Sequence, residues 1–132
     1  MTAAYKRAGL KDDMIKSLIA KNALESGWGK YAQGSYNFGN LTVGSNWNGK
    51  FVTGKDSDGK GSQISQKFRA YDSIDEYVKD EIQFLSKLYD FNPNDDFETF
   101  IKKLDGKNKA GRKYAGVSDY AARVRRVYKG MK

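Results

Sequence analysis

The sequence predicts an α+β fold that is mostly α, with helices arranged around one small central hairpin. Apolar residues recur at helical spacing in several stretches, whereas strand-like alternation is confined to the middle of the chain. The 132 residues are 39% apolar and include 9 Tyr, 7 Phe and 2 Trp, which is enough for one hydrophobic core. We therefore expect a single domain over residues 1–132.

The first part of the chain predicts two helices and then an irregular segment. Residues 2–8 favour a short helix. A longer one is expected from Asp12 or Asp13, either of which can cap it, to Gly27, where glycine favours a stop. Its apolar side chains fall on one face, namely Met14, Ile15, Leu18, Ile19 and Ala23. Residues 30–50 combine Gly, Asn and Ser with aromatic side chains, a mixture that indicates packing or ligand binding.

A hairpin follows in the middle of the sequence. Residues 50–53 and 63–68 have the composition of strands, and Asp58-Gly59 between them is typical of a turn. These residues define a small β-lobe over about residues 46–70, which lies between two groups of predicted helices.

Three helices are expected after the hairpin. Ser73 and Glu76 form a capping box, which predicts a helix that runs to about Tyr89. The next helix is shorter and ends at Gly106, and Ser118 can cap the last one. The inner face of the last helix consists of Tyr120, Ala121, Val124, Val127 and Tyr128.

The composition excludes several classes of protein. The chain has no Cys and no His, which removes thiol nucleophiles, disulfides, zinc-finger sites and Ser-His or Cys-His catalytic pairs. No stretch approaches the roughly 18 apolar residues of a membrane span. The N-terminus lacks the apolar run of a signal peptide, so we expect either a domain of a longer protein or export by another route.

The net charge of +8 is unevenly distributed. Residues 1–101 carry 13 Lys or Arg against 14 Asp or Glu, whereas residues 102–132 carry 11 against 2. This asymmetry indicates an anionic partner, which would be nucleic acid, a membrane surface or an acidic polymer such as bacterial cell wall. The alternative is a solvated basic helix without a partner. Nucleic acid is disfavoured, because the aromatic residues cluster over residues 28–51, away from the basic residues.

Glu25 is the strongest candidate for acid–base chemistry. It falls in the last turn of its predicted helix, inside the apolar arc. Partial burial and the negative end of the helix dipole both disfavour a carboxylate there and raise its pKa. A general acid that works near neutral pH requires such a shift. The alternative is a helix-end glutamate paired with Lys21 or Lys30.

Four short motifs follow one another along the chain. Residues 23–29 are Ala-Leu-Glu-Ser-Gly-Trp-Gly, residues 36–39 are Tyr-Asn-Phe-Gly, and residues 67–73 are Lys-Phe-Arg-Ala-Tyr-Asp-Ser. Tyr-Ala pairs stand at 114–115 and 120–121. In this order they resemble the family 73 glycoside hydrolases, bacterial and phage N-acetylglucosaminidases that cut peptidoglycan and include the flagellar-rod type. The family's second motif, Tyr-Asn-Leu-Phe-Gly, is one residue longer than the match here.

The resemblance implies a lysozyme-like fold, in which a helical lobe and a small β-hairpin lobe flank a glycan cleft. It implies that Glu25 is the general acid in hydrolysis of the bond after N-acetylglucosamine (GlcNAc) in the backbone of GlcNAc and N-acetylmuramic acid (MurNAc). Neither a metal nor a cofactor is needed. The expected partners are peptidoglycan glycan strands and, through the basic residues 102–132, the anionic cell wall. We expect a monomer that acts at the wall and is secreted, periplasmic or delivered by a phage. The alternatives are a muramidase or lytic transglycosylase on the same fold, and an inactive wall-binding module.

The second catalytic group is left open by the sequence. The family often carries a glutamate in a Thr-x-Glu segment of the β-lobe, and its place falls here at Lys55, with Asp56 beside it. Asp56 or Asp58 would substitute if the hairpin register shifts, and would activate a water as general base with inversion. The alternatives are that both aspartates serve the turn, or that the N-acetyl group of the substrate is the nucleophile.

Other site residues follow from the same motifs. Tyr114 matches a cleft tyrosine of the family that positions the sugar or stabilises the cationic transition state. Trp28 and Phe38 are expected to wall the cleft, Asn37 to bind an N-acetyl group or hold its loop, and Trp47 to stack on sugar or fill the β-lobe. Tyr120, on the inner face of the last helix, is expected to pack more than to contact substrate.

Glu81 breaks the apolar pattern of its helix, since it falls at the centre of the apolar arc, where the family usually has a tyrosine. A buried, unpaired carboxylate is costly. We therefore expect Glu81 to be structural and bonded to a nearby arginine or tyrosine.

Overall fold

The computed structural model describes residues 1–30, 32, 34–44, 47–57, 63–115 and 119–131. These ranges contain five helices and one two-stranded antiparallel sheet, in the order α1 (Thr2–Arg7), α2 (Asp12–Ser26), β1 (Phe51–Ser57), β2 (Gln63–Arg69), α3 (Ile74–Tyr89), α4 (Phe97–Leu104) and α5 (Tyr120–Gly130). The predicted α+β fold, mostly α, is confirmed. No helix in these ranges is long and apolar enough to span a membrane.

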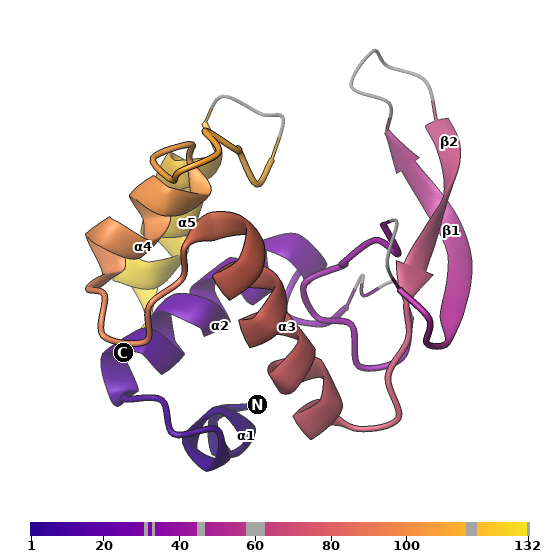
Figure 1. Cartoon of the computed structure of the whole chain (residues 1–132), viewed down its shortest axis with the longest axis horizontal. Helices are drawn as coiled ribbons and strands as arrows, with labels where there is room; N and C mark the ends of the chain where they lie inside the picture. The colour runs from indigo at the N-terminus through magenta and orange to yellow at the C-terminus, as the bar shows by residue number, and fades with distance from the viewer. Residues whose placement is uncertain (31, 33, 45–46, 58–62, 116–118, 132) are drawn as a thin grey trace.

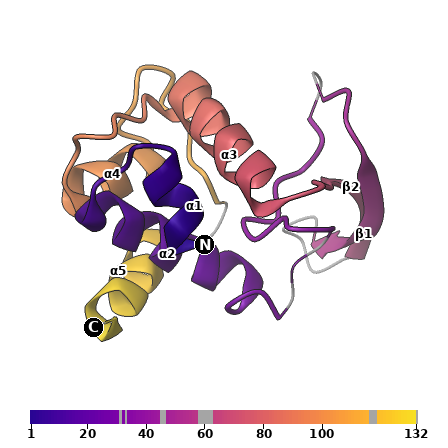
Figure 2. The same ribbon diagram turned by 90° about the horizontal axis from the view of Figure 1, so that it is seen from below.

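The molecule has a helical lobe and a hairpin lobe, with α3 between them (Figure 1). Helices α1, α4 and α5 lie on one side of α3 and the sheet lies on the other, as the view from below also shows (Figure 2). Helix α2 crosses α3, so that its C-terminal end approaches the hairpin lobe. Every helix contributes a fully buried side chain to one core, including Tyr5, Leu18, Leu85, Ile101 and Val124.

Helix α2 has the predicted extent but not the predicted cap. It starts at Asp12, and Lys11 occupies the N-cap position without a side-chain hydrogen bond. The expected capping by Asp12 or Asp13 is therefore wrong. Both acids lie in the first turn instead, where their charge favours the positive end of the helix dipole. The helix ends at Gly27, which has a left-handed φ of 57°.

The predicted capping box at the start of α3 is present with one change. The Ser73 hydroxyl accepts a hydrogen bond from the Glu76 N–H at 3.2 Å. The Glu76 carboxylate accepts from the N–H of Asp72, at 2.6 Å, whereas a standard capping box would use the N–H of Ser73, the N-cap residue. Helices α4 and α5 lie where predicted, with Asp119 at the N-cap of α5, while Ser118 lies outside the described residues.

Strand β1 runs further toward the turn than predicted, to Ser57, whereas β2 begins at Gln63 as predicted. They pair in register, with Asp56 opposite Ile64. Backbone hydrogen bonds continue the ladder through polar residues, which carry no apolar signal in the sequence. The turn itself, with Asp58, lies outside the described residues. Among the described strand residues only Phe68 is buried, so most of the hairpin stands away from the core.

A hydrogen bond between α5 and α2 predicts a change of stability at alkaline pH. The Tyr128 hydroxyl donates to the Asp13 carboxylate, and this bond raises the pKa of Tyr128 to about 12. Because the ordinary tyrosine pKa is about 10, the bond stabilises the fold fully below about pH 10 and is lost as the pH rises toward about 12. Thermal unfolding should therefore show a higher Tm for the wild type than for Tyr128→Phe at neutral pH, with a difference that shrinks over this window. A difference that does not change with pH would contradict the assignment.

Candidate active site

Glu25 lies in the last turn of α2 and is half-buried. The Asn40 side chain donates to the backbone carbonyl of Glu25 at 2.7 Å. One of the carbonyl groups left over at a helix end is therefore satisfied by the loop that follows. Together with the left-handed turn at Gly27, this bond fixes the end of the helix that carries the glutamate.

Tyr114 and Tyr120 bring two phenol groups close to Glu25. Their rings stack with centroids 5.7 Å apart. Burial raises the pKa of Tyr120 well above its usual value, and the negative charge of Glu25 raises it further. Burial likewise raises the pKa of Tyr114, against the opposing charge of Lys21 and with a contribution from Glu25. The phenols therefore stay protonated and can donate hydrogen bonds beside the carboxyl group.

The hydroxyl of Tyr120 is buried and forms no well-aligned hydrogen bond within the described part of the chain, but Glu25 lies close enough to act on it. A buried polar atom of this kind is costly unless water or a ligand completes it. Tyr120 thus lies on the inner face of α5, as predicted, and Glu25 is the neighbouring group that can complete its hydroxyl.

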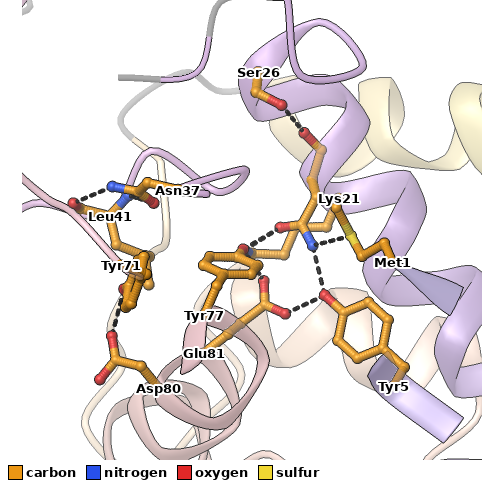
Figure 3. Close-up of polar contacts among 11 residues, drawn as sticks. Met1, Tyr5, Lys21, Ser26, Asn37, Leu41, Tyr71, Tyr77, Asp80 and Glu81 are labelled. Atoms are coloured by element: carbon orange, nitrogen blue, oxygen red, sulfur yellow. Dashed lines mark hydrogen bonds and ion pairs between the residues drawn. The ribbon is translucent and has the colours of Figure 1, made fainter. Parts of the chain in front are cut away.

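A buried polar network lies one helical turn before Glu25 (Figure 3). The Lys21 ammonium donates to Glu81 Oε2 at 2.9 Å and to Asn22 Oδ1 at 3.2 Å, and the side chains of Lys21 and Glu81 are both 0% exposed. Tyr5 donates to the other oxygen of Glu81, and the Tyr77 hydroxyl lies 2.6 Å from Oε2. The network joins α1, α2 and α3.

The predicted bond from Glu81 to a nearby arginine or tyrosine is confirmed by Tyr5 and Tyr77. The cation that pairs with Glu81 is Lys21, which was not predicted. Burial, the largest single effect, would lower the pKa of Lys21, but Glu81, Tyr114 and Glu25 together outweigh it and raise the pKa above the usual value. Lys21 and Glu81 therefore form an ion pair. The same lysine, which the sequence offered as a partner for Glu25, binds Glu81 instead.

The ion pair also supports the wall of the site. The Lys21 ammonium lies 4.7 Å from the centroid of the Tyr114 ring, a cation–π contact. Tyr114 packs on its other sides against Tyr89, at 5.5 Å between centroids, and Phe84, at 6.5 Å. This aromatic cluster fixes the ring that the resemblance places in the cleft.

Gly39 leaves no space for a side chain above this network. A Cβ at this position would lie 2.6 Å from the Tyr77 hydroxyl and 3.1 Å from the Lys21 ammonium. We expect Gly39→Ala to lower the free energy of unfolding by about 1–3 kcal/mol, because it overpacks a buried polar cluster. Urea unfolding measures the effect. Gly9→Ala is not a suitable control, because its φ is +88°, whereas Gly130→Ala meets no atom within 4 Å and should change stability little.

Asn37 holds its loop. Its side chain is 0% exposed and donates to the carbonyl of Leu41 at 2.9 Å (Figure 3). It also donates to the carbonyl of Arg69 at 2.9 Å and accepts from the Leu41 N–H at 2.8 Å. Of the two roles expected for it, the structure shows the structural one. A sugar cannot reach a side chain that is fully buried, so the expected substrate contact is corrected.

Trp28 and Phe38 lie together beside the end of α2. They line a pocket of about 260 Å³ with residues of α2 and the N-terminus. Trp28 is 68% exposed and has a left-handed φ of 61°. Phe38 is half-buried and packs its ring edge against Tyr77, with centroids 6.0 Å apart. Trp28 therefore offers an aromatic face to solvent three residues after Glu25.

Trp47 is half-buried within the hairpin lobe. Its indole N–H donates to the Lys50 carbonyl at 2.9 Å, and its ring packs against Tyr71, with centroids 5.6 Å apart. The Arg69 guanidinium lies 4.8 Å from the same ring. Of the two expected roles of Trp47, stacking on sugar or filling the β-lobe, these contacts show the second. Trp47 also lines a pocket that faces α3.

The structure does not describe the side chain of either candidate for the second catalytic carboxylate, Asp56 or Asp58. The backbone of Asp56 pairs in β1, but its side chain lies outside what the structure describes, as does all of Asp58. Among the described residues, no group of three acidic, His or Cys side chains gathers as a metal site would require.

The binding of Lys21 and Glu81 to each other was not predicted from the sequence. Each residue interrupts the apolar face of its own helix, and two such interruptions of opposite charge are a signal that could have found it. The Arg69–Asp80 pair, at 2.7 Å and largely buried, was also missed.

A helical lobe, a small hairpin lobe and a half-buried glutamate at the end of α2 define a lysozyme-like glycoside hydrolase domain. The chain belongs to the glucosaminidase family, whose model, described as mannosyl-glycoprotein endo-beta-N-acetylglucosaminidase, matches residues 2–132. The resemblance to family 73 is thereby confirmed. A comparison with curated protein sequences found no significant match.

Three solved structures illustrate the similarity. A peptidoglycan hydrolase from Sphingomonas sp. A1 is 30% identical, with a TM-score of 0.72 over 88% of this chain and 74% of that one. The catalytic domain of the autolysin Auto from Listeria monocytogenes is 27% identical, with a TM-score of 0.67 over 98% and 76%. The glycoside hydrolase domain of FlgJ from Salmonella typhimurium, 23% identical with a TM-score of 0.67 over 97% and 79%, bears on the fold alone.

Proposed function

We propose that this glycoside hydrolase is a peptidoglycan endo-β-N-acetylglucosaminidase in which Glu25 is the general acid. The observation that carries the proposal is the position of Glu25, half-buried in the last turn of α2 beside Tyr114 and Tyr120. The similar proteins support the substrate, since one is a peptidoglycan hydrolase and another an autolysin. A glutamate-to-alanine variant of the Sphingomonas enzyme is also among the similar structures.

In the proposed reaction the Glu25 carboxyl transfers its proton to the glycosidic oxygen as the bond from C1 of GlcNAc to that oxygen breaks. The MurNAc fragment leaves as an alcohol. Positive charge develops at C1, and the half-buried Tyr114 would position the sugar beside Glu25, while the buried Tyr120 packs behind it. The oxygen of a water molecule ends on C1. If Asp56 is the base, the proton of that water goes to Asp56 and Glu25 regains a proton from solvent; if the N-acetyl group assists, Glu25 takes the proton of the water itself.

The group that assists the attack is proposed to be Asp56, the acidic residue of β1, or the N-acetyl oxygen of the substrate. The two differ in stereochemistry. A base that activates water gives inversion at C1, whereas participation of the N-acetyl group gives retention. NMR of the first product anomer distinguishes them.

The basic residues near the C-terminus are proposed to hold the enzyme to the anionic wall. On α5, Arg123 and Arg125 bind Asp119 and Glu98, at 2.9 Å and 3.0 Å. Arg126 and Lys129 are exposed and carry the remaining charge of this face. Such attraction is screened by salt, because the Debye length is about 8 Å at physiological ionic strength.

The sugar at the new chain ends tests the proposal. Purified peptidoglycan is digested, reduced with borohydride and analysed by mass spectrometry. Reduced GlcNAc at the new ends is expected. Reduced MurNAc would instead indicate a muramidase, anhydro-MurNAc a lytic transglycosylase, and wall binding without products an inactive module.

A further inference from the structure

We infer that the pocket between α3, the loop before β1 and the loop before α5 binds a carboxylate of the stem peptides, so that the enzyme selects peptide-bearing glycan strands. The inference rests on the proposed function and deepens it. It concerns residues that carry no role in the proposed chemistry at Glu25.

The pocket has a volume of about 500 Å³, within the range of small-molecule sites. It lies where three parts of the molecule meet. Trp47 comes from the hairpin lobe, Phe84 and Leu88 from α3, and Arg112 from the loop before α5. These apolar and aromatic side chains can pack against the aliphatic parts of a peptide, while the charged residues select its ends.

The charges of the pocket favour an anion. Its cations are Arg69, Lys87 and Arg112, and its one acidic residue is Asp80. Asp80 is already engaged, because Arg69 and the Tyr71 hydroxyl donate to it at 2.7 Å and 2.5 Å. Lys87 and Arg112 form no ion pair with any described residue, so the pocket retains two positive charges.

The site is preorganised on the side of Arg69. Its guanidinium lies 4.8 Å from the Trp47 ring and 5.3 Å from the Phe84 ring, and its Nε donates to the Thr42 carbonyl at 2.8 Å. These contacts fix the guanidinium between two aromatic walls before any ligand arrives, which lowers the entropic cost of binding.

The loop that carries Arg112 is also held. Asn108 accepts from the Arg112 N–H at 3.0 Å and donates to the Arg112 carbonyl at 2.7 Å. The Asp90 carboxylate, at the end of α3, accepts from the Lys109 N–H at 2.7 Å. The Arg112 guanidinium is therefore presented from a fixed backbone rather than from a free loop.

The pocket adjoins the candidate active site. Phe84, one of its walls, contacts Tyr114, with ring centroids 6.5 Å apart. Burial raises the pKa of Tyr89, and the positive charge of Arg112 opposes this rise. The ring centroids of Tyr89 and Tyr114 lie 5.5 Å apart. A glycan strand bound beside Glu25 would carry its peptide substituents toward this pocket. On a bare strand the carboxylate is the lactyl group of MurNAc, directly on the sugar, whereas on a substituted strand that group is an amide and the carboxylates lie further out along the peptide. A cationic pocket away from Glu25 therefore favours substituted strands.

The test uses peptidoglycan from which phosphate polymers have been extracted, in two forms. One form is untreated, and in the other the peptide carboxylates are converted to methylamides with a carbodiimide. The wild type should cut the untreated form about five- to tenfold faster at low substrate, since charge-assisted contacts are worth more than neutral ones. In Lys87→Gln/Arg112→Gln this preference should be lost through a higher KM, with the rate on the methylamide form unchanged.

The matched control is Lys6→Gln/Lys79→Gln, which removes the same charge from exposed positions outside the pocket. It should keep the wild-type preference. Equal wild-type rates on both forms, or an equal loss in both double variants, would overturn the inference. Walls that retain phosphate polymer are digested in parallel, and a loss in Lys87→Gln/Arg112→Gln that is confined to these walls would reassign the pocket to that polymer. If the wild type cuts neither form, the proposed function itself fails.

Discussion

Glu25→Gln is expected to lower the rate of peptidoglycan hydrolysis by about 10²–10⁴-fold, because the amide cannot protonate the leaving oxygen. The substitution keeps the size and shape of the side chain, and the hydrogen bond from Asn40 goes to the backbone carbonyl of residue 25, which the substitution leaves in place. Fold and wall binding should therefore survive. Clearance of a peptidoglycan suspension gives the rate, and cosedimentation with the wall gives binding.

Glu98→Gln is the matched control for this experiment. Glu98 is an exposed helical glutamate whose pKa is lowered by its hydrogen bond to Arg125. Its loss should leave the rate close to that of the wild type. A Glu25→Gln variant that is folded and retains most of the wild-type rate would remove Glu25 from the proposed acid role.

Lys21→Met should cause the largest loss of stability among the substitutions considered, about 3–5 kcal/mol in the free energy of unfolding. The substitution leaves the fully buried Glu81 carboxylate without its cation. The hydrogen bonds from Tyr5 and Tyr77 remain, but neutral donors do not offset the desolvation of a charge in the core. Urea unfolding measures the change.

The double variant Lys21→Met/Glu81→Gln tests the cause. Because both charges are removed together, it should recover most of the stability that Lys21→Met loses. Lys50→Met, which breaks the exposed Lys50–Asp72 pair, should have little effect. A double variant that is as unstable as the sum of the two single substitutions would show that the ion pair is not the reason.

The helices were predicted from sequence because their signals are local. Ser73 and Glu76 stand three residues apart, and Gly27 lies directly after the last residue of α2. The hairpin was predicted too short, since strand pairing depends on a partner segment and continues through polar residues. The predicted capping of α2 by an aspartate was wrong, because acidic residues near a helix start are favoured both at the N-cap and in the first turn, where they interact with the helix dipole.

The candidate site was predictable in part. The apolar arc around Glu25 and the motif that follows it are local features of the sequence. The partner of Glu81 could not be predicted from local sequence, because Lys21 lies 60 residues away and the two meet only in the tertiary structure. Burial likewise decided between the two roles of Asn37, and no sequence pattern shows that the Tyr120 hydroxyl forms no well-aligned hydrogen bond among the described residues.

Digestion of peptidoglycan in ¹⁸O-labelled water, followed at once by borohydride reduction and mass spectrometry, tests the central claim most directly. Hydrolysis by the wild type should place the label on C1 of terminal GlcNAc, and Glu25→Gln should give almost no labelled ends. Label on terminal MurNAc, or unlabelled anhydro-MurNAc ends, would contradict the claim.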